Sequence, residues 1–592
     1  MFIPRGFDEI VFPDFEFSQP PGCVPRVVSV CAREAVSGRS FRMFLDEGWP
    51  AEPPWRTDRR CLYAGYALAA EMSAHLSLGW KLPDYLLDLF FEFRWLTNDF
   101  AERRGLLDAC EYKNVRLPPD RRSAKREMRD LAIRWFDRPR TTEERRALLD
   151  YNQEDVDDTI KLYEAMQGDI DFGKAIAFRG HYAKDVALME RAGIPIDVRN
   201  RSQIVERRDE LRRKLIDARR GQYPVYGARY EFSFALFEKY LAGRNIAWPR
   251  TATGRLETRK KTFEQMTKAH PVMGDLYDLR TALTQVRAAS DVPRTRGGRP
   301  VYFLPVGPDS LARTPLMPFG TRTGRNAPST TAFAFNLATC LRPLVDPRWM
   351  PGYDKDGYGL AYIDYGQQEF AIQAVRSMDP EMLAAYRSGD PYTFYPQRAG
   401  YTHEQALAQR DQFKRATLGI GYGMGVETLA YYVGVDYGRA EELLGVHQSV
   451  FKAYWKWQDD VVLEHWRQGV PMVVPYDGWR YFTEGAKKGT CYNFFMQAGG
   501  ATMLRTAVRE VHKAGIVIHA PVHDALLIGA PARDLQDAAH TAARIMCDVG
   551  ERVLEGVLRP RADVKLLVNH RYRDKRGRRM WESICESLGL ES

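Results

Sequence analysis

Two aspartates, Asp364 and Asp524, stand at the ends of apolar runs that predict β-strands. Asp364 closes the run 358–364, and Asp524 lies in the turn between the runs 516–520 and 525–528. If these strands are neighbours, both carboxylates reach one edge of a sheet, where they stay ionised best by sharing divalent cations. A pair of such cations activates a hydroxyl and stabilises a leaving pyrophosphate, so the two acids predict phosphoryl transfer. Either acid alone would more often be a turn or helix cap.

A second candidate group lies on a predicted helix over 404–421. Arg410, Lys414 and Leu418 recur at every fourth position, and Tyr422 continues the series. This spacing keeps the side chains on one helix face. Arginine and lysine there can line a triphosphate and neutralise the charge that moves onto its leaving group. Taken alone, the pattern also fits an ordinary basic helix surface.

A third candidate group lies near the amino terminus. Strand alternation over 12–17 puts Asp14 and Glu16 on the same side. Further along, Tyr151 and Asp155 are one helical turn apart. The acids in the strand alone would equally fit a polar edge-strand face.

The elements that must position these groups alternate between strands and helices. Strand signals occupy residues 10–12, 27–30 and 42–45, and helical patterns follow. This mixture predicts an α/β domain that ends near residue 175. The charged segment 118–145 reads as a solvated helical surface. The predicted helices cover 62–79, 84–97, 150–168, 380–388, 404–421, 437–466 and 490–512, with a mainly helical, charged stretch over 176–300.

Size and composition limit the class of protein. A chain of 592 residues is too long for one core, and an apolar content of 45% supports several real ones. The net charge of +9 favours a polyanionic partner. Eight scattered cysteines without CxxC spacing argue against zinc and indicate a reducing compartment. Since neither a signal peptide nor an apolar run of about 18 residues is found, we expect a soluble intracellular protein without a membrane partner.

The three stretches 364–369, 410–423 and 522–524 resemble, in order and spacing, motifs A, B and C of family A DNA polymerases. Two further segments agree with this resemblance. Residues 321–325, with Asn336 after them, resemble the T-x-T-G-R stretch that contacts primer and template. Residues 492–501 resemble the N-x-x-x-Q helix that lies in the minor groove. The resemblance spans roughly residues 200–570, and five collinear matches are specific.

The resemblance implies a template-directed DNA polymerase that extends a primer 3′ end with dNTPs. Asp364 and Asp524, assisted by the Tyr365 carbonyl, would hold two Mg²⁺ ions, for which Mn²⁺ can substitute. Glu369 would block a ribose 2′-hydroxyl, and Lys414 is also a candidate proton donor to pyrophosphate. The implied dNTP contacts are Gln367, Glu369, Arg410, Lys414, Leu418 and Tyr422, and the implied DNA contacts are Arg325, Asn336, Asn493, Gln497 and His523.

Three positions depart from the family pattern. Leu418 stands where the family usually has Phe or Tyr, which predicts rejection of dideoxynucleotides. Ala525 replaces the glutamate that commonly follows His-Asp, so the role of that acid is missing or supplied elsewhere. Gly366 replaces a serine. None of these changes removes an implied metal ligand.

The amino-terminal pattern resembles the first and third motifs of DEDD-type 3′–5′ exonucleases, which have a ribonuclease H-like fold. In that chemistry two metals activate a water against the terminal phosphodiester, and a tyrosine, here Tyr151, orients the water. Asp14, Glu16 and Asp155 would be metal ligands. The middle motif is less clear, because its best alignment offers Glu71, and Asp88 is a rival.

The combined prediction is an α/β multidomain protein, with an exonuclease domain followed by a right-hand polymerase domain. The predicted divisions are an exonuclease domain over 1–175, a thumb over 176–310, a palm over 311–378 and 490–592, and fingers over 379–489. Mutation of Asp14 and Glu16 to alanine should abolish degradation while extension survives.

The biological setting follows by analogy only. A chain of this length without a 5′-nuclease domain resembles a bacteriophage replicative enzyme. We therefore expect a monomer in the host cytoplasm that binds primer–template DNA and dNTPs and works with phage replisome proteins. Two alternatives stay open, namely a single-subunit RNA polymerase-like enzyme and a catalytically silent DNA-binding scaffold.

Overall fold

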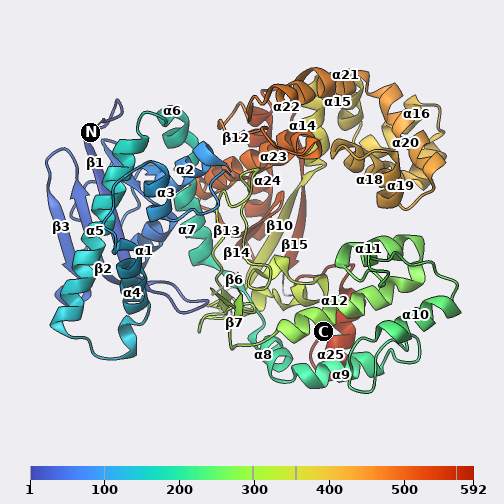
Figure 1. The fold of residues 1–592 in the computed structure, drawn as a ribbon, viewed down its shortest axis with the longest axis horizontal. Helices are drawn as coiled ribbons and strands as arrows, with labels where there is room; N and C mark the ends of the chain where they lie inside the picture. The colour runs from blue at the N-terminus through green and yellow to red at the C-terminus, as the bar shows by residue number, and fades with distance from the viewer. Residues whose placement is uncertain (1, 99, 297–298, 354–356, 569) are drawn as a thin grey trace.

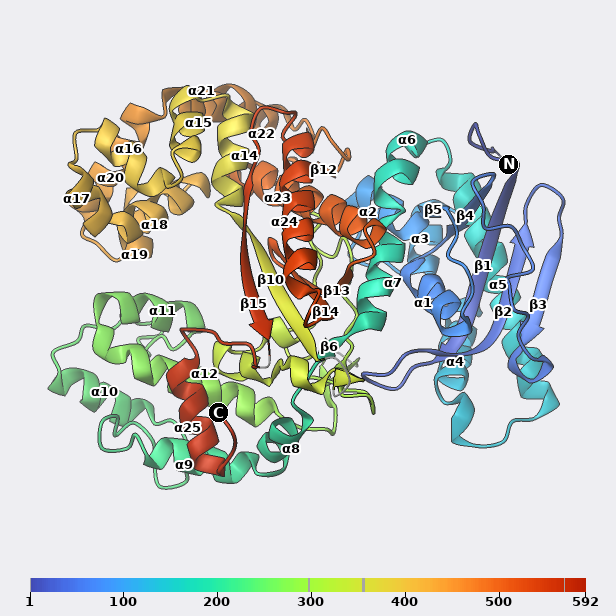
Figure 2. The same ribbon diagram turned by 180° about the vertical axis from the view of Figure 1, so that it is seen from behind.

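The computed structural model describes residues 2–98, 100–296, 299–353, 357–568 and 570–592 (Figure 1). An amino-terminal α/β body lies beside a larger body whose central sheet stands between two helical lobes (Figures 1 and 2). Both views place α7 (Tyr182–Ala192) between the two bodies.

The amino-terminal sheet has the strand order β3-β2-β1-β4-β5. Strands β1, β2 and β3 are antiparallel neighbours, whereas β4 runs parallel to β1 and β5 parallel to β4. Alternation along β1 sends Ile10 and Phe12 into one core and Val11 into the other. The strands are β1 (Glu9–Ser18), β2 (Arg26–Glu34), β3 (Ser40–Phe44), β4 (Cys61–Gly65) and β5 (Tyr85–Asp88).

Two of the predicted helices were wrong at their starts. The range 62–79 begins in β4 and the range 84–97 begins one residue before β5, and their helices begin only at Ala69 and Leu89. Short apolar strands that are buried on both faces do not alternate, so their pattern does not separate them from helix.

Helices cover both faces of this sheet. The longest, α5 (Thr142–Met166), packs on β1 and β2 and starts at a capping box in which the Thr141 hydroxyl accepts from the Glu144 amide. It contains the predicted helix 150–168 almost to its end. The others are α1 (Ala69–Leu78), α2 (Leu89–Thr97), α3 (Leu106–Tyr112), α4 (Arg121–Ile133) and α6 (Phe172–Lys174), the last followed by a π-helical turn over Ala175–Arg179.

The central sheet of the larger body is antiparallel, in the order β13-β14-β10-β15. Its strands are β10 (Tyr358–Gly366), β13 (Val517–Val522), β14 (Ala525–Pro531) and β15 (Arg561–Val568). The predicted strand 358–364 and the predicted hairpin at 516–528 are confirmed. Helix α24 (Leu535–Val553) packs against this sheet, and α23 (Lys488–Lys513) packs on α24.

One helical lobe follows β10 in the chain. The predicted helix 404–421 is divided in two, and 437–466 is divided into shorter helices around a π-helical turn. The helices are α14 (Gln368–Ser377), α15 (Pro380–Arg387), α16 (Pro391–Arg398), α17 (His403–Ala408), α18 (Arg410–Gly421), α19 (Val426–Val433), α20 (Tyr437–Val450), α21 (Lys452–Trp457) and α22 (Glu464–Gln468). A ribbon of β11 (Met472–Val473) and β12 (Arg480–Tyr481) follows.

The other lobe contains α8 (Val198–Glu206), α9 (Arg208–Asp217), α10 (Phe234–Gly243), α11 (Lys260–Ala269) and α12 (Gly274–Ala288). The carboxy-terminal helix α25 (Arg578–Leu588) packs on α9 and α12 (Figure 2). The predicted palm range 490–592 therefore ends in a helix that lies on the predicted thumb. Two short ribbons, β6 (Ile194–Pro195) with β9 (Leu311–Ala312) and β7 (Arg294–Arg296) with β8 (Arg299–Val301), complete the described strands.

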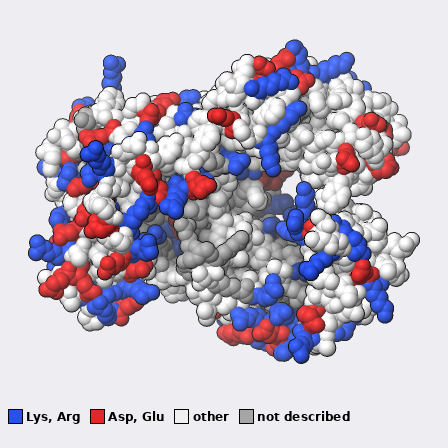
Figure 3. Space-filling view, in the orientation of Figure 1, with Lys and Arg blue, Asp and Glu red and all other residues white. Residues whose placement is uncertain are grey.

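The surface is hollowed between the two helical lobes, and lysine and arginine side chains stand along its edges (Figure 3). Within the described ranges, none of the helices combines the length and the apolar character that crossing a bilayer requires.

Candidate functional site

The structure brings Asp364 and Asp524 together at one end of the central sheet. Asp364 is paired with Ala525 across β10 and β14, and the Tyr365 amide donates to the Asp524 carbonyl at 3.2 Å. Oδ1 of Asp364 is buried and lacks a hydrogen-bond partner among the described residues. Burial, followed by the Asp524 carboxylate, raises the pKa of Asp364 to about 7. The charge of Lys565 opposes this rise only in part, and two close carboxylates of this kind suit a divalent cation.

A third carboxylate lies beside this pair and was not predicted. Asp563 on β15 is directly opposite Asp364, so both side chains stand on the same face of the sheet. Tyr365, the next residue of β10, points the other way, and its hydroxyl donates to the Met546 carbonyl of α24 at 2.7 Å. In the sequence, Asp563 lies in a run of mixed polar and apolar residues that shows no motif. Only the strand register shows that it lies next to Asp364.

Glu369, Tyr422 and Arg325 meet next to the acids. The Tyr422 hydroxyl donates to Glu369 Oε2 at 2.9 Å, and Arg325 Nη2 lies 3.9 Å from Oε1 of the same carboxylate. Burial raises the pKa of Glu369, and the hydrogen bond from Tyr422 and the charge of Arg325 oppose that rise. Three segments that the sequence linked only by resemblance are thus in contact.

The predicted stripe on α18 is present, but its first member is engaged. Arg410 Nε donates to Asp390 Oδ2 at 2.6 Å, while Lys414 is exposed and Leu418 is half-buried. Gln367 precedes α14 in the left-handed backbone region, and its Oε1 accepts from Arg561 Nη2 at 2.7 Å. Arg410 and Gln367 therefore have protein partners that the sequence did not indicate.

The residues predicted to contact DNA divide into two groups. Asn493 and Gln497 on α23 line an open groove of about 410 Å³ together with Thr321 and Thr323. Arg325, Asn336 and His523 line a second hollow of about 150 Å³.

Two of these residues have features that bear on their predicted role. The amide of Asn336 donates to the Pro328 carbonyl at 3.1 Å, so it stabilises its own loop. His523 has a φ of 58° in the β13–β14 turn, and burial lowers its pKa.

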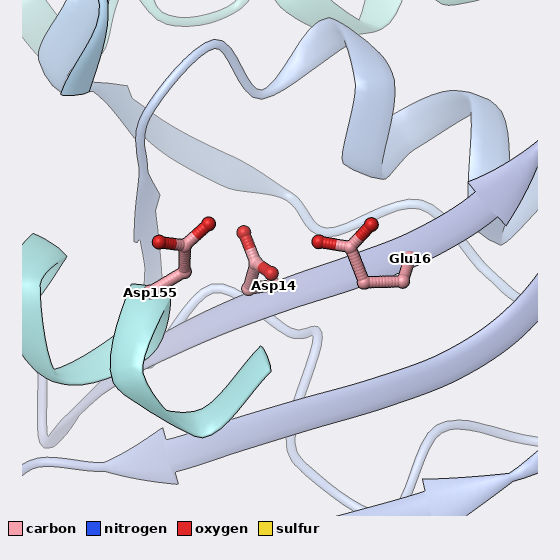
Figure 4. Close-up of side chains that lie close together, drawn as sticks. All are labelled: Asp14, Glu16 and Asp155. Carbon is pink, nitrogen blue, oxygen red and sulfur yellow. The ribbon is translucent and has the colours of Figure 1, made fainter. Parts of the chain in front are cut away.

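In the amino-terminal body, Asp14, Glu16 and Asp155 form a compact acidic cluster. One carboxylate oxygen of each lies within 4.8 Å of the others (Figure 4). Burial, followed by the Asp155 carboxylate, raises the pKa of Asp14 to about 7, and the pKa of Glu16 also rises. The cluster has the oxygen donors that Mg²⁺ prefers.

The two rivals for the middle acid have different surroundings. Glu71 Oε2 accepts from the Phe15 amide at 3.0 Å, and burial together with the nearby Asp14 raises the pKa of Glu71. Asp88 instead accepts from backbone amides, including those of Leu68 at 2.8 Å and Phe90 at 2.9 Å, and thereby caps α2. Its oxygens are occupied, so the geometry favours Glu71.

Two cations of α4 reach the acidic cluster and were missed by the sequence. Arg121 Nη2 and Lys125 Nζ both contact Asp155, whose Oδ2 also accepts from the Tyr151 hydroxyl at 2.9 Å. The interpretation of 118–145 as solvated surface was wrong here, because the Arg121 side chain is only 3% exposed. High charge density masked a helix that packs on β1 and α5.

Comparison with known proteins gives a family match in the larger body. Residues 350–573 match the sequence model of the family described as DNA polymerase family A. Two curated relatives named DNA polymerase, from Mycobacterium phages D29 and L5, are each 24% identical, over 238 and 200 residues. These matches cover 40% and 33% of the chain, but only 37% and 32% of the relatives' own lengths.

A solved structure extends the likeness in fold. It is described as the POL domain of Pol1 from M. smegmatis in complex with DNA primer-template and dNTP. It superposes with a TM-score of 0.67 at 16% identity, covering 95% of this chain and 96% of the other. At that identity the likeness concerns the fold.

Proposed function

We propose that the protein is a template-directed DNA polymerase that extends a primer 3′ end with dNTPs, because residues 350–573 match the sequence model of DNA polymerase family A. The observation that carries this proposal is the meeting of Asp364 and Asp524, where the buried Oδ1 of Asp364 has no hydrogen-bond partner within the described part of the chain. A silent DNA-binding scaffold would have no need of two acids held this close, because their repulsion is costly without a cation.

The metal sites are assigned to Asp364, Asp524 and the Tyr365 carbonyl, with Mg²⁺ or Mn²⁺ as the ion. Two bound ions would supply activation of the primer hydroxyl and neutralisation of the leaving group. Lys414, exposed on α18, would bind the triphosphate and give a proton to pyrophosphate. Arg410 would exchange Asp390 for a phosphate oxygen. Asp563 is our candidate to replace the glutamate that commonly follows His-Asp in the family, where this chain has Ala525.

Selection of the sugar is assigned to Glu369. Its carboxylate is fixed by the Tyr422 hydroxyl, which leaves little freedom to accommodate a 2′-hydroxyl. This contact favours a DNA polymerase over the single-subunit RNA polymerase alternative. Gln367 and Leu418 complete the proposed nucleotide pocket.

Primer–template DNA is the proposed macromolecular partner. Arg325, Asn493 and Gln497 would read minor-groove acceptors, which all correct base pairs present alike, with Asn336 and His523 near the primer end. Positive charge along the hollow between the lobes would hold phosphates, so binding should weaken steeply with salt (Figure 3). We assign the lobe with α9–α12 as thumb, the lobe with α15–α21 as fingers, and the central sheet as palm.

We further propose a 3′–5′ proofreading exonuclease in the amino-terminal body. The acidic cluster of Asp14, Glu16 and Asp155 supports it, with Glu71 as the fourth acid. Tyr151 would orient the attacking water. The strand order of this sheet is also compatible with a ribonuclease H-like fold.

The proposed setting is phage genome replication by a monomer in the host cytoplasm, together with other replisome proteins. The names of the two mycobacteriophage relatives support a phage origin.

Primer extension with Mg²⁺ tests the polymerase proposal. We expect wild type and Asp14→Asn to extend a primer, and Asp524→Asn to lose extension by at least about 1,000-fold, because a metal ligand is gone. In degradation of single-stranded DNA, wild type and Asp524→Asn should be active, and Asp14→Asn should lose activity. Equal extension by wild type and Asp524→Asn would refute the catalytic assignment.

A further inference from the structure

Helix α2 of the amino-terminal body holds the backbone of the loop 319–325, which carries Arg325. Arg94 Nε donates to the Phe319 carbonyl at 3.2 Å, and its Nη2 donates to the Thr321 carbonyl at 3.4 Å. Asn98 Nδ2, one turn further along, donates to the Arg322 carbonyl at 3.0 Å. Arg94 and Asn98 are 0% and 2% exposed, so these are interior contacts.

The loop needs such support because its backbone is strained. Phe319 has a φ of 52° and Met317 a φ of 51°, values that residues with a Cβ rarely adopt. Such conformations persist only where surrounding contacts fix them. Part of the fixing comes from α2, since the Phe91 ring lies 4.7 Å from the Phe319 ring, measured between centroids. Trp479 lies on Phe319 as well, at 4.8 Å.

A second route leads from α2 to the far end of the same loop. Glu92 accepts two hydrogen bonds from Arg179, at 2.7 and 2.6 Å, and both side chains are buried. Arg179 Nη1 donates to the Asp477 carbonyl at 2.8 Å. The Asp477 carboxylate accepts from Arg505, whose Nη1 donates to the Gly324 carbonyl at 2.6 Å.

These contacts close a ring that starts and ends on α2. One arm reaches the carbonyls of 319–322 directly, and the other reaches Gly324 through Arg179, Asp477 and Arg505. Trp95 of α2 strengthens the second arm, because its Nε1 donates to the Gly478 carbonyl at 2.6 Å. Arg325, next in the chain after Gly324, then lies 3.9 Å from Glu369.

We propose that Arg94 and Asn98, in the amino-terminal body, are positioning residues for primer extension, acting through the loop that carries Arg325. This inference rests on the proposed polymerase function, and it does not depend on exonuclease activity. It assigns the amino-terminal body a second role, as a structural part of the polymerase site. Misplacement of a contact group by about 1 Å can slow a reaction by about 100-fold, so the support of this loop matters for rate.

The test compares variants of the full chain in single-turnover extension. Asn98→Ala removes donors without leaving a buried charge, and Arg94→Met keeps length but removes the guanidinium. Lys184→Met is the matched control, because Lys184 donates to the Pro83 and Asp84 carbonyls and not to the 319–325 loop. Arg325→Ala shows how much the extension rate falls when the loop loses the Arg325 side chain itself.

We expect Asn98→Ala and Arg94→Met to slow the maximal extension rate by at least about tenfold. The dNTP concentration for half-maximal rate should change less than about twofold, and Lys184→Met should match wild type. Adding Asn98→Ala to Arg325→Ala should cause no further loss, since both act on one contact. A merely structural role would lower the unfolding midpoint without this non-additivity.

Several outcomes would overturn the inference. They are multiplicative losses in the double variant, wild-type rates in Asn98→Ala, or equal losses in Lys184→Met. If Arg94→Met fails to fold, Asn98→Ala decides the question. Failure of the proposed function looks different, because wild type itself would then not extend a primer.

Discussion

The Tyr422 hydroxyl donates a hydrogen bond of 2.9 Å to Oε2 of Glu369, joining the end of α18 to the start of α14. The contact links the helix that carries Lys414 to the segment that follows Asp364. Glu369, which we propose selects the sugar, is therefore held in place by a residue at the end of α18, the helix that we propose binds the triphosphate.

Replacement of Glu369 by alanine should relax sugar selection. Loss of the carboxylate opens room for a 2′-hydroxyl, so the ratio of ribonucleotide to deoxynucleotide kcat/KM should rise by about 10–200-fold, as for other small-group discrimination in pockets. Single-nucleotide incorporation measures this ratio. Tyr422→Phe removes the hydrogen bond to Glu369 but leaves the Glu369 carboxylate present, so it should show a smaller rise in this ratio. An unchanged ratio in Glu369→Ala would contradict the assignment.

Metal affinity at the polymerase acids should depend on pH. The folded, metal-free pKa of Asp364 is raised to about 7, above its unfolded value, so the folded state holds this proton up to neutral pH. Metal must displace it, and apparent Mn²⁺ affinity should fall by about tenfold per pH unit below 7.

The same shift predicts a stability effect of defined sign. Without metal, ionising Asp364 costs folding free energy, so this cost is absent below about pH 4 and grows as pH rises towards 7. In EDTA, Asp364→Asn should therefore be more stable than wild type at pH 8 and no more stable at pH 4. Thermal unfolding at both values measures this. Greater stability of wild type at pH 8 would run against the prediction.

Asp563→Asn tests whether β15 supplies a carboxylate in place of the family glutamate that Ala525 replaces. Because Asp563 is opposite Asp364, its loss should weaken Mg²⁺ binding and slow extension by about 10–100-fold, less than the loss of Asp524. A Mg²⁺ titration of the extension rate provides the measurement. Asp534→Asn, at the exposed start of α24, serves as the control. A loss equal to that of the control would remove Asp563 from the site.

Lys125→Met tests the cation that contacts Asp155. In the metal-free protein Lys125 neutralises the acidic cluster, so its removal should tighten Mn²⁺ binding there by about tenfold. Titration with Mn²⁺, followed by electron paramagnetic resonance in an Asp364→Asn, Asp524→Asn background, isolates this cluster. Lys161→Met is the matched control, since Lys161 pairs with Asp158 on the same helix. Weaker binding in Lys125→Met would mean that Lys125 supports the metal site.

Local patterns carried much of the prediction. Asp364 and Asp524 were found because each ends an apolar run, and their strands pair as predicted. The stripe of Arg410, Lys414 and Leu418 follows from helical periodicity, which depends only on nearby residues. Such signals survive in the chain because hydrophobic spacing determines which face of an element is buried.

Tertiary structure decided which distant groups share a surface. Asp563 meets Asp364 through strand register, Lys125 meets Asp155 through packing of α4, and Arg94 meets the 319–325 loop across two bodies. Nothing in the neighbourhood of these residues in the chain marks them, because their partners are far away in sequence and their charge suggests solvent. Burial next to a specific carbonyl or carboxylate, which exists only after folding, is what gives each of them a role.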